Sequence, residues 1–129
     1  MKTVLVVDDD PDIRELIIWK LSQSGYATIA AANGEDALAA VRARRADLPD
    51  LVLLDWMMPK QAGIDVCRAI RQDPVTAHIP VVFLTAKAQQ SEMERGFEAG
   101  ADDYIVKPFS PREMLSRIEA VLARAEGAK

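Results

Sequence analysis

Acidic residues follow two short apolar runs of the sequence, and their placement suggests chemistry rather than folding. Asp8 and Asp9 come directly after VLVV, and Asp55 follows LVLL. An ionised carboxylate buried without a partner costs several kcal/mol, so packing alone does not explain an acid at the end of a buried strand. For Asp55 taken by itself, a plain turn after the strand is an equally good explanation.

Two further apolar runs end in groups that can stabilise a phosphoryl group. Thr85 closes VVFLT, and Lys107 follows YIV. A hydroxyl and an ammonium group can donate hydrogen bonds to phosphoryl oxygens. Two carboxylates about 4 Å apart repel by about 4 kcal/mol at an effective dielectric constant of about 20, and Lys107 alone cannot balance three of them. The sequence therefore predicts a hard divalent cation, Mg²⁺ or Mn²⁺, rather than zinc, which would need nearby Cys or His ligands.

The elements that must position these groups can be read from short apolar runs that alternate with amphipathic stretches. Strands are predicted at residues 3–7, 27–31, 51–54, 81–85 and 104–106. Most of these runs lack apolar/polar alternation, which is typical of strands covered on both faces in a parallel sheet. Helix starts and stops predict helices from the Asp10 cap and Pro11 to Gly25, from Asn33, after Gly63, from Ser91 to Gly100, and from Ser110.

Strand–helix units in this order predict an α/β fold, a five-stranded doubly wound parallel sheet with five helices. Right-handed crossovers bring the carboxyl ends of all the strands to one edge, and ligands bind beyond that edge where the strand order reverses. The groups expected to converge there are Asp8, Asp9, Asp55, Thr85 and Lys107. Within that arrangement Asp55 is central in the sheet and is the best-placed nucleophile for attack on phosphorus.

The composition is that of one globular domain, with 129 residues, of which 50% are hydrophobic and 28% charged. A net charge of −4 without a basic stripe argues against a nucleic-acid-binding surface. No apolar run reaches about 18 residues, so no membrane span is expected. The run VLVV is too short for a signal peptide, and the single cysteine, Cys67, is expected to be buried filler in a reducing cytoplasm.

Taken together and in order, the motifs resemble the receiver domain of bacterial two-component response regulators. The matching stretches are VLVVDDDPDIRE, LVLLDWMMP followed by AG, IPVVFLTA and GADDYIVKPFSPREML. The resemblance covers essentially the entire chain and implies a flavodoxin-like sheet with the strand order 2-1-3-4-5. We expect a receiver domain over residues 1–125 and a short C-terminal tail over residues 126–129.

The resemblance implies that Asp55 accepts a phosphoryl group from a sensor histidine kinase or a histidine phosphotransfer protein. The implied Mg²⁺ ligands are Asp8, Asp9, Asp55 and the backbone carbonyl of Met57. Thr85 and Lys107 are the implied contacts of the phosphoryl oxygens. Such a domain is not an enzyme acting on a separate substrate, because it catalyses only its own phosphorylation and dephosphorylation.

The resemblance also implies a switch that controls an output. Tyr104 would move inward as Thr85 moves, altering the surface formed by the fourth helix, the fifth strand and the fifth helix. The Lys107–Pro108 peptide bond is expected to be cis, a form that proline makes accessible.

The stretch GADDYIVKPFSPRE is closest to the subfamily whose receivers are linked to a winged-helix DNA-binding domain. Those receivers dimerise through the same surface, and the residues that fall where cross-dimer ion pairs are expected are Asp102, Asp103, Arg117 and Arg124. Met93 stands where that subfamily usually has a basic residue, which leaves Glu113 without that partner. No winged helix follows in the sequence, so both a stand-alone receiver and part of a longer regulator stay open.

Other functions remain as alternatives. A haloacid-dehalogenase-type phosphohydrolase also uses a strand-end Asp and Mg²⁺, but it normally has a second acid two residues later, where this chain has Met57, and a cap domain. An interaction module that has lost phosphorylation would lack an acid, the Thr or the Lys. A flavin binder would need a Ser/Thr/Gly-rich loop after the first strand. We expect His78 to be a solvated loop residue and Trp19 to pack in the core or at its edge.

Overall fold

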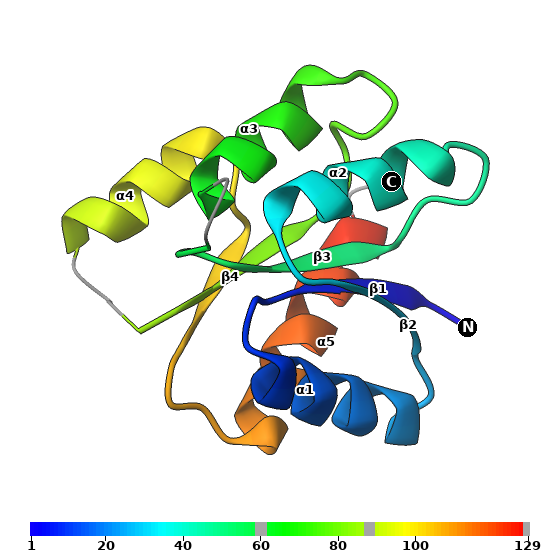
Figure 1. The fold of residues 1–129 in the computed structure, drawn as a ribbon, viewed down its shortest axis with the longest axis vertical. Coiled ribbons are helices and arrows are strands. Elements are labelled where there is room, and N and C mark those ends of the chain that lie inside the picture. The colour runs from blue at the N-terminus through cyan, green and yellow to red at the C-terminus, as the bar shows by residue number, and fades with distance from the viewer. Residues whose placement is uncertain (59–61, 87–89, 128–129) are drawn as a thin grey trace.

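The computed structural model describes residues 1–58, 62–86 and 90–127 (Figure 1). Its strands are β1 (Thr3–Val7), β2 (Ala27–Ala31), β3 (Leu51–Asp55), β4 (Val81–Thr85) and β5 (Asp103–Val106). Its helices are α1 (Pro11–Gln23), α2 (Gly34–Ala43), α3 (Gly63–Gln72), α4 (Gln90–Ala99) and α5 (Pro111–Gly127). Within the described ranges, no helix is both long and apolar enough to cross a membrane.

The five strands form one parallel sheet in the order β2-β1-β3-β4-β5, which confirms the predicted topology. Helices α2, α3 and α4 cover one face of the sheet, and α1 and α5 cover the other (Figure 1). The strand order reverses between β1 and β3, so the carboxyl ends of these two strands flank the position where ligands bind in such sheets.

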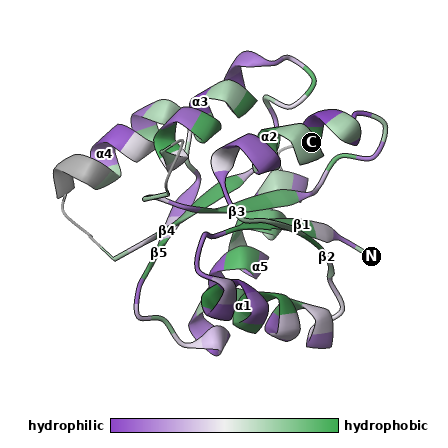
Figure 2. Ribbon diagram, viewed as in Figure 1, coloured by the Kyte–Doolittle hydropathy of each residue, from purple (hydrophilic) through white to green (hydrophobic). Residues whose placement is uncertain are grey.

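The core consists of two apolar layers separated by the sheet, and the central strands are hydrophobic along their length (Figure 2). Every residue of β3 and β4 is buried, as the absence of alternation predicts. Strand β2 lies at the edge and is only partly covered. Cys67 of α3 is fully buried, as predicted for a small side chain that fills space in the core.

Side-chain caps set where several helices begin. Asp10 accepts hydrogen bonds from the backbone N–H groups of Asp12 and Ile13 at the start of α1. Asn33 caps α2 through the N–H of Asp36, and the Ser110 hydroxyl accepts from the N–H of Glu113 at the start of α5. These caps orient the loops that leave the strand ends. The peptide bond between Lys107 and Pro108 is cis, as expected.

Two local predictions are wrong. Helix α4 begins at Gln90, so Ser91 lies inside its first turn and does not precede the helix. Trp19 is 56% exposed and does not belong to the core. Helix α1 buries Ile17 and Leu21, which lie one turn apart, and a residue two positions after Ile17 is directed to the opposite side of a helix with 3.6 residues per turn. His78 is exposed, as predicted.

Candidate functional site

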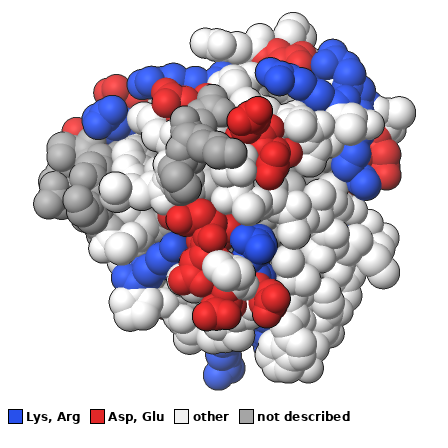
Figure 3. All heavy atoms as spheres, viewed as in Figure 1, with Lys and Arg blue, Asp and Glu red and all other residues white. Residues whose placement is uncertain are grey.

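The three acidic side chains that follow β1 and end β3 come together at the carboxyl edge of the sheet. Oxygen atoms of the Asp8, Asp9 and Asp55 carboxylates all lie within 4.8 Å of one another. Asp8 is completely buried and Asp55 is 6% exposed, whereas Asp9 is exposed. Figure 3 shows acidic side chains gathered in the middle of this face, where β1 leads into α1. The sheet therefore concentrates negative charge around a partly sheltered position.

Among the residues that the structure describes, Lys107 is a cation whose ammonium group contacts two of these carboxylates. It follows β5, and its Nζ lies 3.2 Å from Asp8 Oδ2 and 3.5 Å from Asp55 Oδ1. The Lys107 side chain is 19% exposed, so these contacts are partly shielded from water. One ammonium group shared between two buried carboxylates does not by itself balance the charge of three carboxylates.

The electrostatic consequence is largest at Asp55. Burial, together with the nearby Asp8 carboxylate, raises the pKa of Asp55 to about 7, although Lys107 acts in the opposite direction. A hydrogen bond from the Met57 backbone N–H, 3.4 Å from Asp55 Oδ1, also favours the ionised form. Without a further cation, Asp55 is thus held partly protonated near neutral pH.

The turn between β1 and α1 is organised by contacts that sequence reasoning missed. The Asp10 backbone N–H donates to Asp8 Oδ1 at 3.0 Å, and Arg14 Nη1 donates to the Asp8 backbone carbonyl at 2.8 Å. Arg14 lies six residues after Asp8, on the first turn of α1, where its side chain reaches back to the strand end. The one feature of the sequence that could have indicated this contact is that Arg14 follows the acidic residues closely in the chain.

Gly63 allows α3 to begin directly against the strand end that carries Asp55. A Cβ atom at this position would lie 2.3 Å from the Asp55 backbone oxygen and 3.1 Å from Trp56 Cα. The Gly63 N–H also donates to the Trp56 carbonyl at 3.0 Å. Glycine is therefore required here for close approach, and any larger residue would displace the Asp55 backbone.

Thr85 and Tyr104 occupy the neighbouring strands. Thr85 ends β4, is 3% exposed, and its carbonyl accepts a hydrogen bond from the Lys107 N–H at 2.8 Å. Tyr104 of β5 is 3% exposed, and its hydroxyl donates to the Met93 carbonyl at 2.8 Å. The Tyr104 ring is thus already inside, between β5 and α4. Met57 lies beside the acids with its side chain 65% exposed.

The donor set of this site fits a hard divalent cation. All three clustered side chains offer carboxylate oxygens, and two of them are buried. Oxygen ligands of this kind suit Mg²⁺, which takes one or two carboxylates and completes its shell with water and phosphate oxygens.

Comparison with known proteins decides the family. The model of the response regulator receiver domain matches residues 4–119. The chain belongs to the response regulator receiver family. It is 47% identical over 123 residues to the phosphate regulon transcriptional regulatory protein PhoB of Pseudomonas aeruginosa, covering 95% of this chain and 52% of that protein. It is 49% identical over 122 residues to the transcriptional regulatory protein ResD of Bacillus subtilis, covering 95% of this chain and 48% of ResD.

Solved receiver structures share the fold of this receiver domain. A putative response regulator from Chloroflexus aurantiacus superposes with a TM-score of 0.87 at 39% identity, over 95% of this chain and 98% of the other. A CheY-like receiver domain protein from Methanospirillum hungatei gives 0.90 at 27% identity, over 100% and 99%. The receiver domain spans about half the length of the curated relatives named above, which are transcriptional regulators, in agreement with its similarity to the winged-helix-linked subfamily.

Three of the residues expected at a dimer interface, Asp102, Asp103 and Arg117, make ion pairs within the receiver domain itself. Asp102 Oδ2 lies 3.0 Å from Arg71 Nη2 and accepts from the Val81 N–H at 2.8 Å. Asp103 pairs with Arg117 at 3.4 Å, and Arg117 also lies 3.7 Å from Glu113. Arg124 is exposed near the end of α5. Glu113 therefore has a cationic neighbour on its own helix, although Met93 supplies none.

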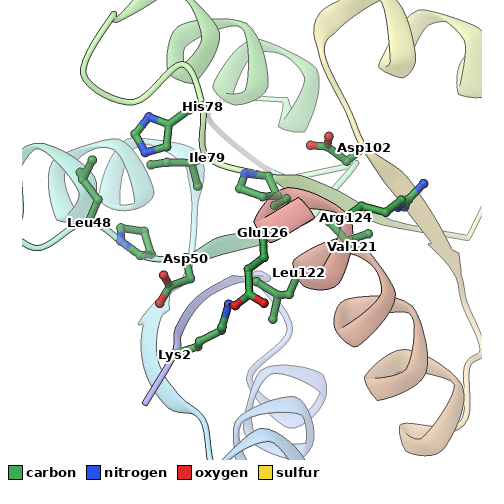
Figure 4. Close-up of a pocket in the computed structure, with 13 residues that line it drawn as sticks. Lys2, Leu48, Asp50, His78, Ile79, Asp102, Val121, Leu122, Arg124 and Glu126 are labelled. Carbon is green, nitrogen blue, oxygen red and sulfur yellow. The ribbon is translucent and has the colours of Figure 1, made fainter. Parts of the chain in front are cut away.

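A separate cavity of about 680 Å³ lies at the opposite edge of the sheet (Figure 4). It is lined by residues next to the amino ends of the strands, such as Lys2, Asp50 and Pro80, and by the last turns of α5. Lys2 and Glu126 form an ion pair there and point toward one another in the close-up. The cavity contains none of the clustered acids or Lys107, so we do not assign it to the functional site.

Proposed function

We propose that this receiver domain is a Mg²⁺-dependent phosphoacceptor switch in two-component signalling, with Asp55 as the acceptor. The single observation that carries the proposal is the cluster of Asp8, Asp9 and Asp55 oxygens within 4.8 Å, with Lys107 shared between two of them. That cluster is electrostatically unfavourable for folding and favourable for holding a cation beside a nucleophilic carboxylate. The donor would be a phosphohistidine of a sensor kinase or of a histidine phosphotransfer protein.

In the proposed reaction, an Asp55 carboxylate oxygen attacks phosphorus as the phosphorus–nitrogen bond of the phosphohistidine breaks. The product is an acyl phosphate on Asp55, and the histidine ring takes up a proton as it leaves. Bound Mg²⁺ would supply positive charge that favours the ionised carboxylate and stabilises the phosphoryl oxygens. Asp8, Asp9, Asp55 and the Met57 carbonyl would hold it.

Lys107 and Thr85 would also stabilise the transferred phosphoryl group. The Lys107 ammonium already lies 3.5 Å from Asp55 Oδ1, so it can contact an oxygen of a phosphoryl group attached there. Thr85 ends the adjoining strand and would donate its hydroxyl to another oxygen. Attack of water on the acyl phosphate would release inorganic phosphate and return Asp55 to its free form, so the reactions that the domain catalyses would be the phosphorylation and dephosphorylation of its own Asp55.

We further propose that phosphorylation alters the surface made by α4, β5 and α5. Thr85 and Tyr104 lie on adjacent strands, and Tyr104 donates a hydrogen bond to the α4 backbone, which connects the acceptor edge with that surface. A phosphoryl group that binds one arrangement of this surface better than another shifts its population. A homodimer using Asp102, Asp103, Arg117 and Arg124 would have to exchange or extend the ion pairs that Asp102, Asp103 and Arg117 make within one chain.

Intact-mass spectrometry after incubation with acetyl phosphate and Mg²⁺ tests the acceptor. We expect the mass of one phosphoryl group to be added to the wild type, and none to Asp55→Asn or in excess EDTA. Asp47→Asn is the matched control, because Asp47 is an exposed loop acid paired with Arg44. Modification of Asp55→Asn to the same extent as the wild type would overturn the assignment.

A further inference from the structure

Tyr104 sits in a compact group of aromatic rings that reaches from the acceptor strand to α4. Its ring centroid lies 5.6 Å from that of Phe83, 6.3 Å from that of Trp56 and 5.0 Å from that of Phe97. Trp56 directly follows Asp55, and Trp56 and Phe83 are in edge-to-face contact at 5.0 Å. Phe97 belongs to α4. The rings therefore form a continuous packed path from the acceptor residue to the helix.

Gly96 is the position of α4 that makes room for Tyr104. A Cβ atom at this position would lie 1.6 Å from the Tyr104 hydroxyl oxygen, 2.8 Å from Tyr104 Cζ and 3.1 Å from Trp56 Cζ3. Real Cβ atoms do not approach other atoms this closely, so no residue with a side chain fits while Tyr104 stays where it is. A glycine inside a helix lowers helix stability relative to alanine, so its presence here calls for a packing reason.

The space left by Gly96, called the notch below, also lets the Tyr104 hydroxyl reach a hydrogen-bond acceptor on α4. Met93 lies one helical turn before Gly96, on the same side of α4, and its carbonyl accepts from Tyr104 at 2.8 Å. A side chain at position 96 would collide with this hydroxyl and force it away from its position beside the carbonyl. A hydrogen bond made by a buried hydroxyl contributes to stability, so the glycine both admits the ring and lets the hydroxyl reach the Met93 carbonyl.

We infer that Gly96 is a positioning residue: with Met93 and Trp56 it forms a socket that holds Tyr104 inward and couples the acceptor strand to α4. Because the ring is enclosed between β5, Trp56 and the helix backbone, Tyr104 and α4 have to move together. In this chain the switch therefore acts by displacing α4 along with a ring that is already inside. This regulatory role rests on the proposed function, whereas the socket itself does not.

A double-mutant cycle tests the socket without reference to phosphorylation. Gly96→Ala should lower the melting temperature by several degrees in the wild-type background, because the added methyl group collides with Tyr104. In a Tyr104→Ala background, the same substitution should raise the melting temperature, because the collision is gone and alanine is the better helix former. A rise in both backgrounds, or an equal fall in both, would overturn the inference.

A spectroscopic measurement separates a displaced ring from general destabilisation. The chain has only two tyrosines and two tryptophans, so fluorotyrosine labelling gives two ¹⁹F resonances, and Trp19→Phe leaves Trp56 as the sole indole. For folded Gly96→Ala we expect the Tyr104 resonance to become accessible to a soluble paramagnet and the Trp56 emission to shift. The Tyr26 resonance serves as internal reference. A Tyr104 resonance that stays protected would contradict the socket.

The coupling is tested by amide exchange of α4 with and without beryllofluoride, a phosphoryl mimic, in the presence of Mg²⁺. In the wild type the exchange of α4 should change, whereas in Gly96→Ala that change should be lost although acetyl phosphate still modifies Asp55. An α4 response equal in both proteins would overturn the coupling. Absence of any modification of wild-type Asp55 would instead reject the proposed function and leave the melting and ¹⁹F results standing.

Discussion

Asp55→Asn is expected to stabilise the metal-free protein, although it removes the proposed acceptor. Burial and the Asp8 carboxylate raise the pKa of Asp55 from 3.8 to about 7 in the folded chain. A shift of about three units, at about 1.4 kcal/mol each, corresponds to at most about 4 kcal/mol of unfavourable free energy when the group is ionised. Relaxation of the neighbours and the lost attraction to Lys107 reduce the gain, so we expect about 1 to 3 kcal/mol at pH 8.

The pH dependence identifies the cause of this gain. Because the folded pKa lies above the unfolded value, the folded chain binds the proton more tightly, and this group lowers the free energy of unfolding as the pH rises from about 4 to about 7. Asparagine removes this slope. The difference between Asp55→Asn and the wild type should therefore be close to zero at pH 4 and largest at pH 8.

Urea unfolding in EDTA between pH 4 and pH 8 provides the measurement, with Glu98→Gln as the control. Glu98 is an exposed residue of α4, so its substitution should change stability by less than about 0.5 kcal/mol. Saturating Mg²⁺ should reduce the advantage of Asp55→Asn, because only the wild type retains the full carboxylate set. A variant less stable than the wild type at pH 8 in EDTA, or a gain independent of pH, would refute the reasoning.

Three further predictions follow from the same geometry. Mg²⁺ should stabilise the wild type by about 2.7 kcal/mol at 100 times its dissociation constant, and Asp9→Asn should weaken binding in calorimetry; equal binding by the two proteins would remove Asp9 from the ligand set. Lys107→Met should cost about 3 kcal/mol in urea unfolding at pH 8, because it leaves Asp8 and Asp55 without the ammonium group; Lys20→Met is the control, and equal losses would contradict the ion-pair argument. Burial raises the pKa of the Cys67 thiol to about 11, so a thiol reagent should react with it only as the chain unfolds; rapid labelling of the native protein would disprove this.

Local patterns in the sequence were sufficient to predict the fold and the edge at which the acids gather. Apolar runs without alternating polar residues indicate strands buried on both faces. Capping residues such as Asp10 and Asn33 indicate where helices begin. In a parallel sheet these facts already place the carboxyl ends of the strands at one edge. The convergence of Asp8, Asp9 and Asp55 therefore required only the chain order and the handedness of the crossovers.

Contacts between side chains distant in the chain were not predictable in this way. The pairing of Asp102 with Arg71, the reach of Arg14 to the Asp8 carbonyl and the exposure of Trp19 depend on how each helix is rotated and packed on the sheet. The notch at Gly96 is of the same kind, since a glycine within an amphipathic helix gives no sign of which ring will lie against it.

The sequence by itself thus determined which residues stand at the strand ends, because strand periodicity and capping are properties of neighbouring residues. Only the tertiary structure decided how strongly those residues perturb one another and which helix packs against the aromatic rings beside them. Burial, dielectric environment and steric fit arise when separate elements pack together, and no local pattern encodes their distances.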